Sequence, residues 1–517
     1  MDEDKQKRIS NGVKVLLVNF SAEILKDIVL ELQKKSVEVV YWTGAKNDFD
    51  KFSQDKENFP NTIFHDYFDA VRAIPAPGVD ISEFQPPGRD ILKKLAECEN
   101  FTIPMMNRID FTEEMSVYDR KHLYHEYVRY WYGVLNKYKP EAIIFSSIPH
   151  IVYNYVLYSV AKMMGIKTIM YRPLQITSRV LFFNDFKEYK VLGEVYDEIK
   201  DSNIDLSSLS VDIQSYYNYQ IDPNKDSTPW YRKESYVKQK SRQTQLAPSV
   251  SSVLKSLLKF DFLKKLHFHF FAKSRLFSVD QDNYYSPWRL KKWQYRWKKN
   301  RRGFENEYRS LQTEVDFNKK FVYIPLANQP ECSTNPLGGI YDDQILMVQT
   351  VADSIPDDWV IYVKETPLQW KWRLSHLGRY KGYYKKLSKI NKVYLAPPEV
   401  STYDLIDKMQ TVATVTGTAA WEGLLRGKPA LIFGYPWFMH CDGIFKISDV
   451  ETCQNAIGKI IDGYQPSKQK FINFLAAIDK TTIEAYFYDK FKLKDSNISY
   501  EDNIKNIVEA MHKEIVK

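Results

Sequence analysis

Short apolar runs of strand length alternate with amphipathic segments in the first part of this 517-residue chain. The apolar runs lie at 13–18, 37–42, 142–145 and 167–171. Apolar residues with helical spacing follow Ser21 and return over 151–164. Strand–helix–strand alternation of this kind is typical of βαβ units and predicts a parallel sheet. We therefore predict an α/β, Rossmann-like domain over residues 1–200, in which the Pro-rich stretch 59–88 is a loop.

The same alternation resumes in the second half of the chain. The apolar runs there lie at 321–326, 359–364, 393–395, 412–415 and 430–433. A helical pattern occupies 342–354 between the first two of them. This order predicts a second Rossmann-like domain over 319–470. Two α/β halves of comparable size favour a ligand bound in a cleft between them.

The segments outside these two halves have weaker periodicity. Residues 201–318 are first polar and then basic and aromatic, with helical pieces such as 252–266, and we expect a connector. Residues 471–517 are predicted to be helical, and one of these helices is expected to pack back on the first domain.

Composition narrows the protein class. With 44% hydrophobic residues the chain is globular. It has no uninterrupted apolar stretch of about 18 residues, so no transmembrane helix is expected. Its polar, acidic N-terminus and four scattered cysteines favour a protein of the reducing cytoplasm without a secretory signal. The absence of a nucleophile elbow, Walker loop or metal-spaced ligand set leaves hydrolase, ATPase and metalloenzyme hypotheses without support.

Positive charge is concentrated in one part of the connector. Residues 255–305 contain 14 Lys or Arg against 4 Asp or Glu, and they include Trp288, Trp293, Tyr295 and Trp297. Such a stripe can bind an anionic membrane surface, an acidic glycan or nucleic acid, or it can be a solvated helix face. No nucleic-acid module accompanies it, so nucleic acid is not expected as a partner.

Candidate chemistry follows the predicted strands of the second half, where open α/β sheets bind ligands. The run Gln329–Thr334 places Glu331 in a Pro-flanked turn ahead of a Gly338–Gly339 pair. This arrangement suits a polar ligand, or it is a structural loop in which Glu331 caps a helix.

Two further clusters are a strand-end lysine and a glycine turn. Lys364 opens Lys-Glu-Thr-Pro and can neutralise a phosphate, or it is an ordinary charged strand end. Thr416, Gly417 and Thr418 precede a helix whose free N–H groups suit a phosphate, and Glu422 lies one turn further on. The alternative is a capped helix packed on the sheet.

The first half offers weaker candidates. Ser147 and His150 follow the strand at 142–145, and Arg172 ends the strand at 167–171. His150 is a candidate general base for a sugar hydroxyl, or a structural cap. Arg172 is a candidate anion ligand, or a member of a surface ion pair, and Asp110 is a further candidate carboxylate.

An ordered set of residues in the second half resembles the bacterial capsule and surface polysaccharide biosynthesis glycosyltransferases, which include enzymes that use a CMP-activated ulosonic acid (Kdo). The set comprises Pro325-Leu326, Gln329-Pro330-Glu331, Ser333-Thr334, Pro336-Leu337-Gly338-Gly339, Asp343-Gln344, Val363-Lys364-Glu365-x-Pro367, Thr416-Gly417-Thr418-x-x-Trp421-Glu422 and Gly427-Lys428-Pro429-x-x-x-Phe433-Gly434. The resemblance covers about residues 320–445.

The resemblance implies a GT-B architecture, with two Rossmann-like domains whose parallel sheets face a central cleft. It implies sugar transfer from a nucleotide-sugar donor to a surface-polysaccharide or lipid-linked acceptor, without a cofactor or a bound metal. Carried over by position, Lys364, Thr416, Gly417 and Thr418 would meet the donor phosphate. Glu422 would meet ribose or sugar hydroxyls, and Glu331 would lie near the reacting sugar.

Thr366 departs from the pattern, because the family usually has Lys-x-His-Pro at this motif. A threonine donates one hydrogen bond but carries no positive charge. Either the donor differs, or Lys364 and the helix dipole suffice, or activity has been lost. The alternatives to a glycosyltransferase are a sugar-nucleotide epimerase-like enzyme and a non-catalytic glycan-binding or assembly protein. A cytoplasmic location at the inner face of the membrane is expected, with 255–302 as the contact.

Overall fold

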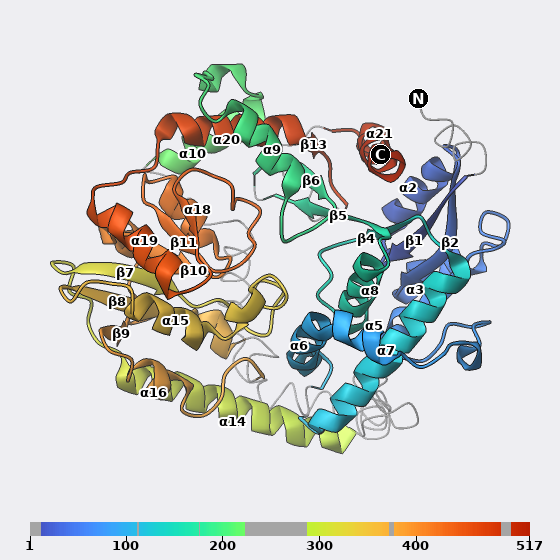
Figure 1. Cartoon of the computed structure of the whole chain (residues 1–517), viewed down its shortest axis with the longest axis horizontal. Coiled ribbons are helices and arrows are strands. Elements are labelled where there is room, and N and C mark those ends of the chain that lie inside the picture. The colour runs from blue at the N-terminus through green and yellow to red at the C-terminus, as the bar shows by residue number, and fades with distance from the viewer. Residues whose placement is uncertain (1–11, 111–112, 175, 223–286, 372–376, 488–497) are drawn as a thin grey trace, which may run out of the picture.

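The computed structural model describes residues 12–110, 113–174, 176–222, 287–371, 377–487 and 498–517. Within these residues the chain forms two α/β domains, each built on one sheet (Figure 1). The predicted helix at 252–266 lies outside the described residues.

The first sheet has the strand order β13-β6-β5-β4-β1-β2-β3. Its strands are β1 (Val13–Val18), β2 (Val37–Gly44), β3 (Ile63–Asp66), β4 (Ala142–Phe145), β5 (Lys167–Pro173), β6 (Arg179–Phe183) and β13 (Thr482–Glu484). Strands β1 to β5 are parallel, whereas β6 pairs antiparallel with both β5 and β13. The predicted parallel sheet is confirmed, with an antiparallel edge that the sequence did not predict.

Helices cover both faces of this sheet because its strands are apolar on both sides. Val15 and Leu17 pack with α2 and α21, while Leu16 and Val18 point to the opposite face with α7 and α8. The helices of this domain are α2 (Glu23–Gln33), α3 (Lys46–Gln54), α4 (Tyr67–Val71), α5 (Arg89–Lys94), α6 (Ala96–Met105), α7 (Val117–Tyr138), α8 (Val152–Met163), α9 (Lys190–Ile199) and α21 (Tyr500–Val516).

The second sheet is parallel throughout and has the order β12-β11-β10-β7-β8-β9. Its strands are β7 (Lys320–Pro325), β8 (Trp359–Lys364), β9 (Val393–Leu395), β10 (Thr411–Thr414), β11 (Ala430–Ile432) and β12 (Ile444–Lys446). Its helices are α14 (Pro287–Leu311), α15 (Gln344–Ala352), α16 (Tyr383–Leu387), α17 (Thr402–Lys408), α18 (Thr418–Leu424) and α19 (Val450–Ile461). The two sheets of Rossmann type confirm the predicted GT-B-like fold class.

Two connections join the domains. The forward connection includes α10 (Val211–Ile221), and the chain returns through α20 (Lys468–Thr481), β13 and α21. Tyr500 of α21 donates to the Asp27 carboxylate of α2 at 2.6 Å, so the C-terminal helix lies on the first domain. One apolar cluster is continuous between the two domains, and Trp421, Trp437 and Phe474 lie within it.

The stretch 59–88, predicted as a loop, contains β3 and α4, so that prediction is wrong in part. Asp66 ends β3 and starts α4 by accepting from the N–H groups of Phe68 and Asp69. The strand lies at the sheet edge, where only one neighbour is needed, and a short apolar run is enough to form it.

A buried histidine in β3 is fixed in its neutral form. Nε2 of His65 donates to the Ile74 carbonyl at 2.8 Å, and Nδ1 accepts from the Tyr41 hydroxyl at 2.8 Å. Tyr41 in turn accepts from the Tyr130 hydroxyl. Burial lowers the pKa of His65 to about 4.

We expect the stability of the protein to fall as the pH drops from about 6.5 to about 4. In this window the unfolded histidine binds a proton and the folded His65 does not, so unfolding takes up protons and is favoured by acid. The contribution of His65 is at most about 3 kcal/mol. Urea unfolding at several pH values measures it. His65→Gln should flatten the pH dependence, and an unchanged slope in this variant would contradict the prediction.

Candidate functional site

The strand order brings the three sequence clusters of the second domain together. Strand β7 lies between β8 and β10, so the loop after β7 is flanked by Lys364 on one side and by the Thr416–Thr418 turn on the other. The strands that carry the three clusters are therefore neighbours in the sheet, which is the condition for the expected convergence of these clusters.

The turn after β10 is tight and polar. The Gly417 N–H donates to Thr414 Oγ1 at 3.2 Å, and a Cβ at Gly417 would lie only 2.7 Å from that oxygen. Thr416 Oγ1 donates to the Ser333 carbonyl at 2.8 Å, which ties this turn to the loop after β7. Thr418 opens α18, and its buried hydroxyl has no hydrogen-bond partner within the described structure. Glu422 lies one turn further along α18 and is buried.

Lys364 and Thr366 lie on the other flank. Lys364 Nζ donates to the Val400 carbonyl and to Thr402 Oγ1 at 3.1 Å, so the ammonium lies against the start of α17. Thr366 caps the short 3₁₀ helix Pro367–Trp370, and its Oγ1 accepts weakly from the Leu368 N–H at 3.4 Å. The residue that replaces the family histidine therefore has a local structural role.

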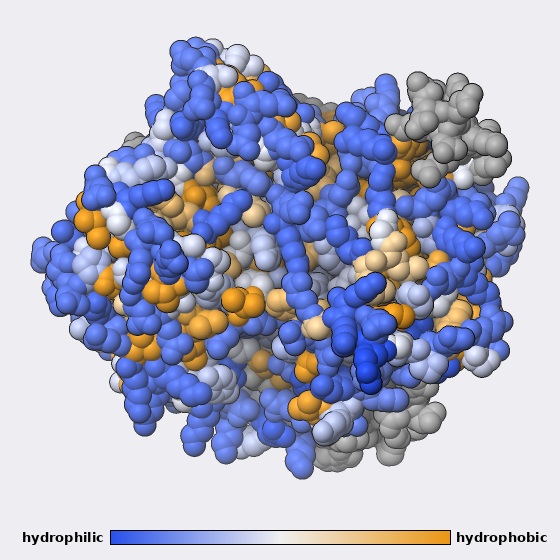
Figure 2. Space-filling model, viewed as in Figure 1, coloured by the Kyte–Doolittle hydropathy of each residue, from blue (hydrophilic) through white to orange (hydrophobic). Residues whose placement is uncertain are grey.

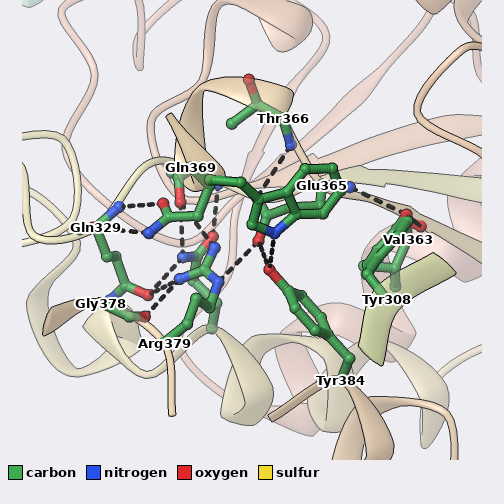
Figure 3. A network of polar contacts seen from close by, with 12 residues as sticks. Tyr308, Gln329, Val363, Glu365, Thr366, Gln369, Gly378, Arg379 and Tyr384 are labelled. Carbon is green, nitrogen blue, oxygen red and sulfur yellow. Dashed lines mark hydrogen bonds and ion pairs between the residues drawn. The ribbon is translucent and has the colours of Figure 1, made fainter. Parts of the chain in front are cut away.

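Glu365, which lies between Lys364 and Thr366 in the sequence, forms a fully buried ion pair with Arg379 (Figure 3). Glu365 Oε2 accepts from Arg379 Nε at 2.8 Å and from the Tyr384 hydroxyl at 2.8 Å, and both charged side chains are 0% exposed. The Thr366 N–H donates to the other carboxylate oxygen at 3.0 Å. The neighbouring Glu365 charge raises the pKa of Arg379 against the opposing effect of burial.

The same network fixes the loop after β7. Arg379 donates to Gln329 Oε1 at 2.6 Å and to the Ala327 carbonyl at 3.2 Å. Gln329 also exchanges two hydrogen bonds of 2.9 Å between its backbone and the Gln369 side chain. Gly378 approaches so closely that a Cβ there would lie 2.2 Å from the Gln329 carbonyl oxygen. The loops after β7 and β8 are thus one rigid unit just ahead of Glu331.

An arginine from the first domain reaches this loop. Arg108 donates to the carbonyl of His150 and, at 2.5 Å, to that of Asn335. Asn335 Nδ2 donates back to the Phe101 carbonyl at 3.2 Å. Burial lowers the pKa of Arg108 to about 10, against the opposing effects of Cys332, Glu331 and Asp342, so its guanidinium stays charged at neutral pH.

The two strand-end candidates next to Arg108 are half-buried. His150 Nδ1 donates to the Ile148 carbonyl at 2.6 Å, which fixes the tautomer and leaves the lone pair on Nε2. Burial and then the charge of Arg108 lower the pKa of His150 to about 4, so the ring is neutral at neutral pH and a weak base. Ser147 Oγ lies 3.5 Å from the Ile148 carbonyl.

Arg172 lies in β5, and its guanidinium is 3.5 Å from the Tyr189 hydroxyl. Burial raises the pKa of the Cys332 thiol to about 11, while the charges of Arg108 and then Arg172 oppose the shift. Both arginines of the first domain therefore act electrostatically on the residue that follows Glu331.

Asp110 has the contacts of a structural carboxylate. It is 1% exposed, forms an ion pair of 2.9 Å with Arg120, and accepts from the N–H groups of Glu114 and Met115. These contacts occupy both oxygens and hold the start of α7. We therefore assign Asp110 to the fold rather than to catalysis.

The sequence analysis did not single out Arg108 or the Glu365–Arg379 pair. Arg108 is two positions before Asp110, and Glu365 lies between Lys364 and Thr366, which the sequence analysis did single out. Within the described ranges no group of three or more His, Cys, Asp or Glu side chains is placed to hold a metal ion. No helix among the described residues is long and apolar enough to cross a membrane.

Comparison with known proteins gives a family for part of the chain. Residues 236–460 match the family described as capsule polysaccharide biosynthesis protein, which confirms the resemblance inferred from the motifs. The capsule polysaccharide modification protein LipA of Neisseria meningitidis serogroup B is 30% identical over 80 residues. That alignment covers 15% of this chain and 11% of LipA.

Solved structures that match over long stretches differ strongly in sequence and shape. The beta Kdo 2,7 transferase of Thermosulfurimonas dismutans KpsC covers 91% of this chain and 99% of its own, with 10% identity and a TM-score of 0.30. The UDP-GlcNAc 2-epimerase of Neisseria meningitidis bound to UDP-GlcNAc covers 98% and 100%, with 13% identity and a TM-score of 0.21. Likenesses this loose say nothing about function.

Breaking the buried ion pair should strongly destabilise the second domain. Arg379→Met leaves the Glu365 carboxylate buried without its cation, and we expect a loss of about 3–5 kcal/mol in the free energy of unfolding. The matched control is Arg309→Met, which breaks the exposed ion pairs with Glu305 and Glu399 and should cost less than about 1 kcal/mol. Chemical denaturation measures both variants, and equal losses would contradict a special role for the buried pair.

Proposed function

We propose that this chain, which matches the capsule polysaccharide biosynthesis family over residues 236–460, is a glycosyltransferase. It transfers a sugar from a nucleotide-sugar donor, with CMP-Kdo as a candidate, to a surface-polysaccharide or lipid-linked glycan acceptor. The family match supports the biosynthetic setting. The loop after β7, which Arg108 of the first domain and Thr416 of the β10 turn both contact, supports the assignment to sugar transfer.

The donor phosphate is assigned to the turn after β10. Phosphate groups bind where backbone N–H groups and hydroxyls converge at the carboxyl edge of a parallel sheet. Thr418 supports this assignment, because a buried hydroxyl ordinarily has a hydrogen-bond partner and this one has none within the described structure. Glu422 is assigned to hydroxyl groups of the ribose or the sugar.

The charge that Thr366 lacks is assigned to other residues. Departure of a nucleotide is accelerated by cations placed near the phosphate oxygens. Lys364 lies on one flank of the central loop, and Arg108 and Arg172 approach that loop from the first domain. A guanidinium group binds phosphate oxygens in a bidentate manner, and Arg172 is assigned this role. Arg108, whose two terminal nitrogens donate to backbone carbonyl groups, contributes positive potential only.

Activation of the acceptor hydroxyl is assigned to Glu331 rather than to His150. His150 lies beside the Arg108 guanidinium, whose positive charge opposes protonation of the ring. Glu331 is the carboxylate that the family resemblance places near the reacting sugar. Ser147 is assigned to the acceptor side. Transfer without a metal, location in the cytoplasm and contact of 255–302 with the inner face of the membrane are further parts of the proposal.

Nucleotides should stabilise the protein through the assigned donor site. We expect CMP, or else UDP or GDP, to raise the melting temperature of the full chain, because a ligand at about 100 times its Kd adds about 2.7 kcal/mol. Lys364→Ala and Thr418→Ala should each reduce this rise. Lys385→Ala, an exposed lysine of α16, is the control and should leave it unchanged. If none of these nucleotides or their sugars shifts the melting temperature, the proposed function is wrong.

Glu331→Gln should lower the rate of sugar transfer and leave donor binding unchanged. Loss of a general base typically costs about 100-fold or more, so we expect kcat to fall by at least about 100-fold. The melting-temperature rise with nucleotide should remain as in the wild type. The measurement is sugar transfer to an acceptor glycan by the purified chain. Retained turnover would show that Glu331 does not act as the base.

A further inference from the structure

The long helix α14 lies along one edge of the molecule and connects its two domains (Figure 1). At its C-terminal end Glu307 accepts from the Gly382 N–H at 3.0 Å, just ahead of α16. Nearer its N-terminal end Arg296 forms an ion pair of 3.0 Å with Glu113, four residues before α7 begins. The helix therefore contacts both domains.

The two faces of α14 differ sharply. Trp293, Trp297, Phe304 and Tyr308 lie on one side, where Phe304 and Tyr308 are buried in the core of the second domain. The opposite side carries the α14 basic face, which consists of the exposed residues Lys292, Arg296, Lys298, Lys299 and Arg302. By helical geometry these residues extend over about 15 Å of the axis. No acidic residue occurs in α14 before Glu305.

Exposed apolar side chains gather beside the basic face. Tyr295, which lies within it, is 72% exposed, and at the start of α7 Tyr118 is 83% and Val117 61% exposed. Only Val211, at 76%, and Ile340, at 63%, are comparably exposed large hydrophobic residues elsewhere in the described structure. The Arg296–Glu113 pair brings the start of α7 next to α14. In Figure 2 the lower edge, along which α14 runs in Figure 1, is mostly hydrophilic.

We propose that the α14 basic face, together with Val117, Tyr118 and Tyr295, is a docking surface for an anionic lipid bilayer. Lys and Arg are attracted to anionic headgroups, and tyrosine and short aliphatic side chains are stable in the interfacial layer. Phe304 and Tyr308, on the apolar side of α14, are buried in the second domain, so in this proposal the helix lies on the headgroups and does not insert. An acidic glycan would match the cations but offers no apolar layer for Val117.

The docking surface adds a location to the proposed function, and it rests on that function in assuming a lipid-linked acceptor. A lipid-linked acceptor lies at a membrane, and a transferase fixed there by α14 would meet it by diffusion in two dimensions. The surface involves none of the residues assigned to donor or acceptor. Vesicle binding is therefore measured without nucleotide, and its outcome is independent of the donor-site test.

Flotation of the full chain with vesicles tests the proposal. We expect binding to vesicles of phosphatidylcholine with about 30% phosphatidylglycerol and none to phosphatidylcholine alone, with binding weakened by 0.5 M salt. Lys292→Glu/Lys299→Glu/Arg302→Glu should lower the partition coefficient by at least about tenfold. Tyr118→Ser/Tyr295→Ser should lower it less, and this part of the loss should persist at high salt.

The control is Lys459→Glu/Lys468→Glu/Lys505→Glu, which makes the same change in net charge at exposed positions on α19, α20 and α21. This variant should bind anionic vesicles nearly as well as the wild type. Equal losses in the two charge variants, or no binding of the wild type to anionic vesicles, would overturn the proposal. Displacement from the vesicles by a soluble acidic polysaccharide that binds more tightly than the lipid would assign the face to a glycan instead.

Discussion

The buried ion pair between Glu365 and Arg379 holds the candidate site in shape. Two charges at 0% exposure are stable only when every polar atom around them is satisfied, and here Tyr384, Gln329, the Ala327 carbonyl and the Thr366 N–H do this. The pair therefore constrains two loops at once. The loop after β8 presents Lys364, and the loop after β7 leads into Glu331. A shift of the β8 loop would separate the buried pair, and a shift of the β7 loop would remove the hydrogen bonds of Arg379 to Gln329 and to the Ala327 carbonyl.

The first domain completes the site through a different kind of contact. Arg108 binds backbone carbonyl groups of both domains, and carbonyl groups accept without cancelling its charge. The guanidinium is thus held firmly and still adds a positive field near Cys332 and Glu331. Arg108 and Arg172 both act electrostatically on Cys332, and the carboxylates of Glu331 and Asp342 act on Arg108. An anionic substrate would find its counter-charges on the first domain and its N–H groups on the second.

The sequence predicted the repeated βα order and the clusters at the strand ends, because both depend on local patterns of apolar residues and glycine. It did not predict β6, β12 or β13, which have five, three and three residues and form because neighbouring strands offer unpaired backbone groups. Nor did it point to Arg379 as the partner of Glu365. The pairing arises where the chain returns to the β8 loop, and nothing in the local pattern marks either residue as buried. Arg108 was missed for the same reason, since its importance depends on the approach of the other domain.

The role of Thr366 is clear from its contacts in the structure. In the sequence it stands where the resembled family usually has a histidine, and a threonine carries no positive charge. In the structure its N–H donates to Glu365, and its hydroxyl caps the 3₁₀ helix that carries Gln369. The position thus supports the rigid unit that fixes the β7 and β8 loops. The replacement of histidine by threonine is therefore compatible with an ordered site. Under the proposed function, the positive charge for the leaving phosphate comes from Lys364, Arg108 and Arg172 instead.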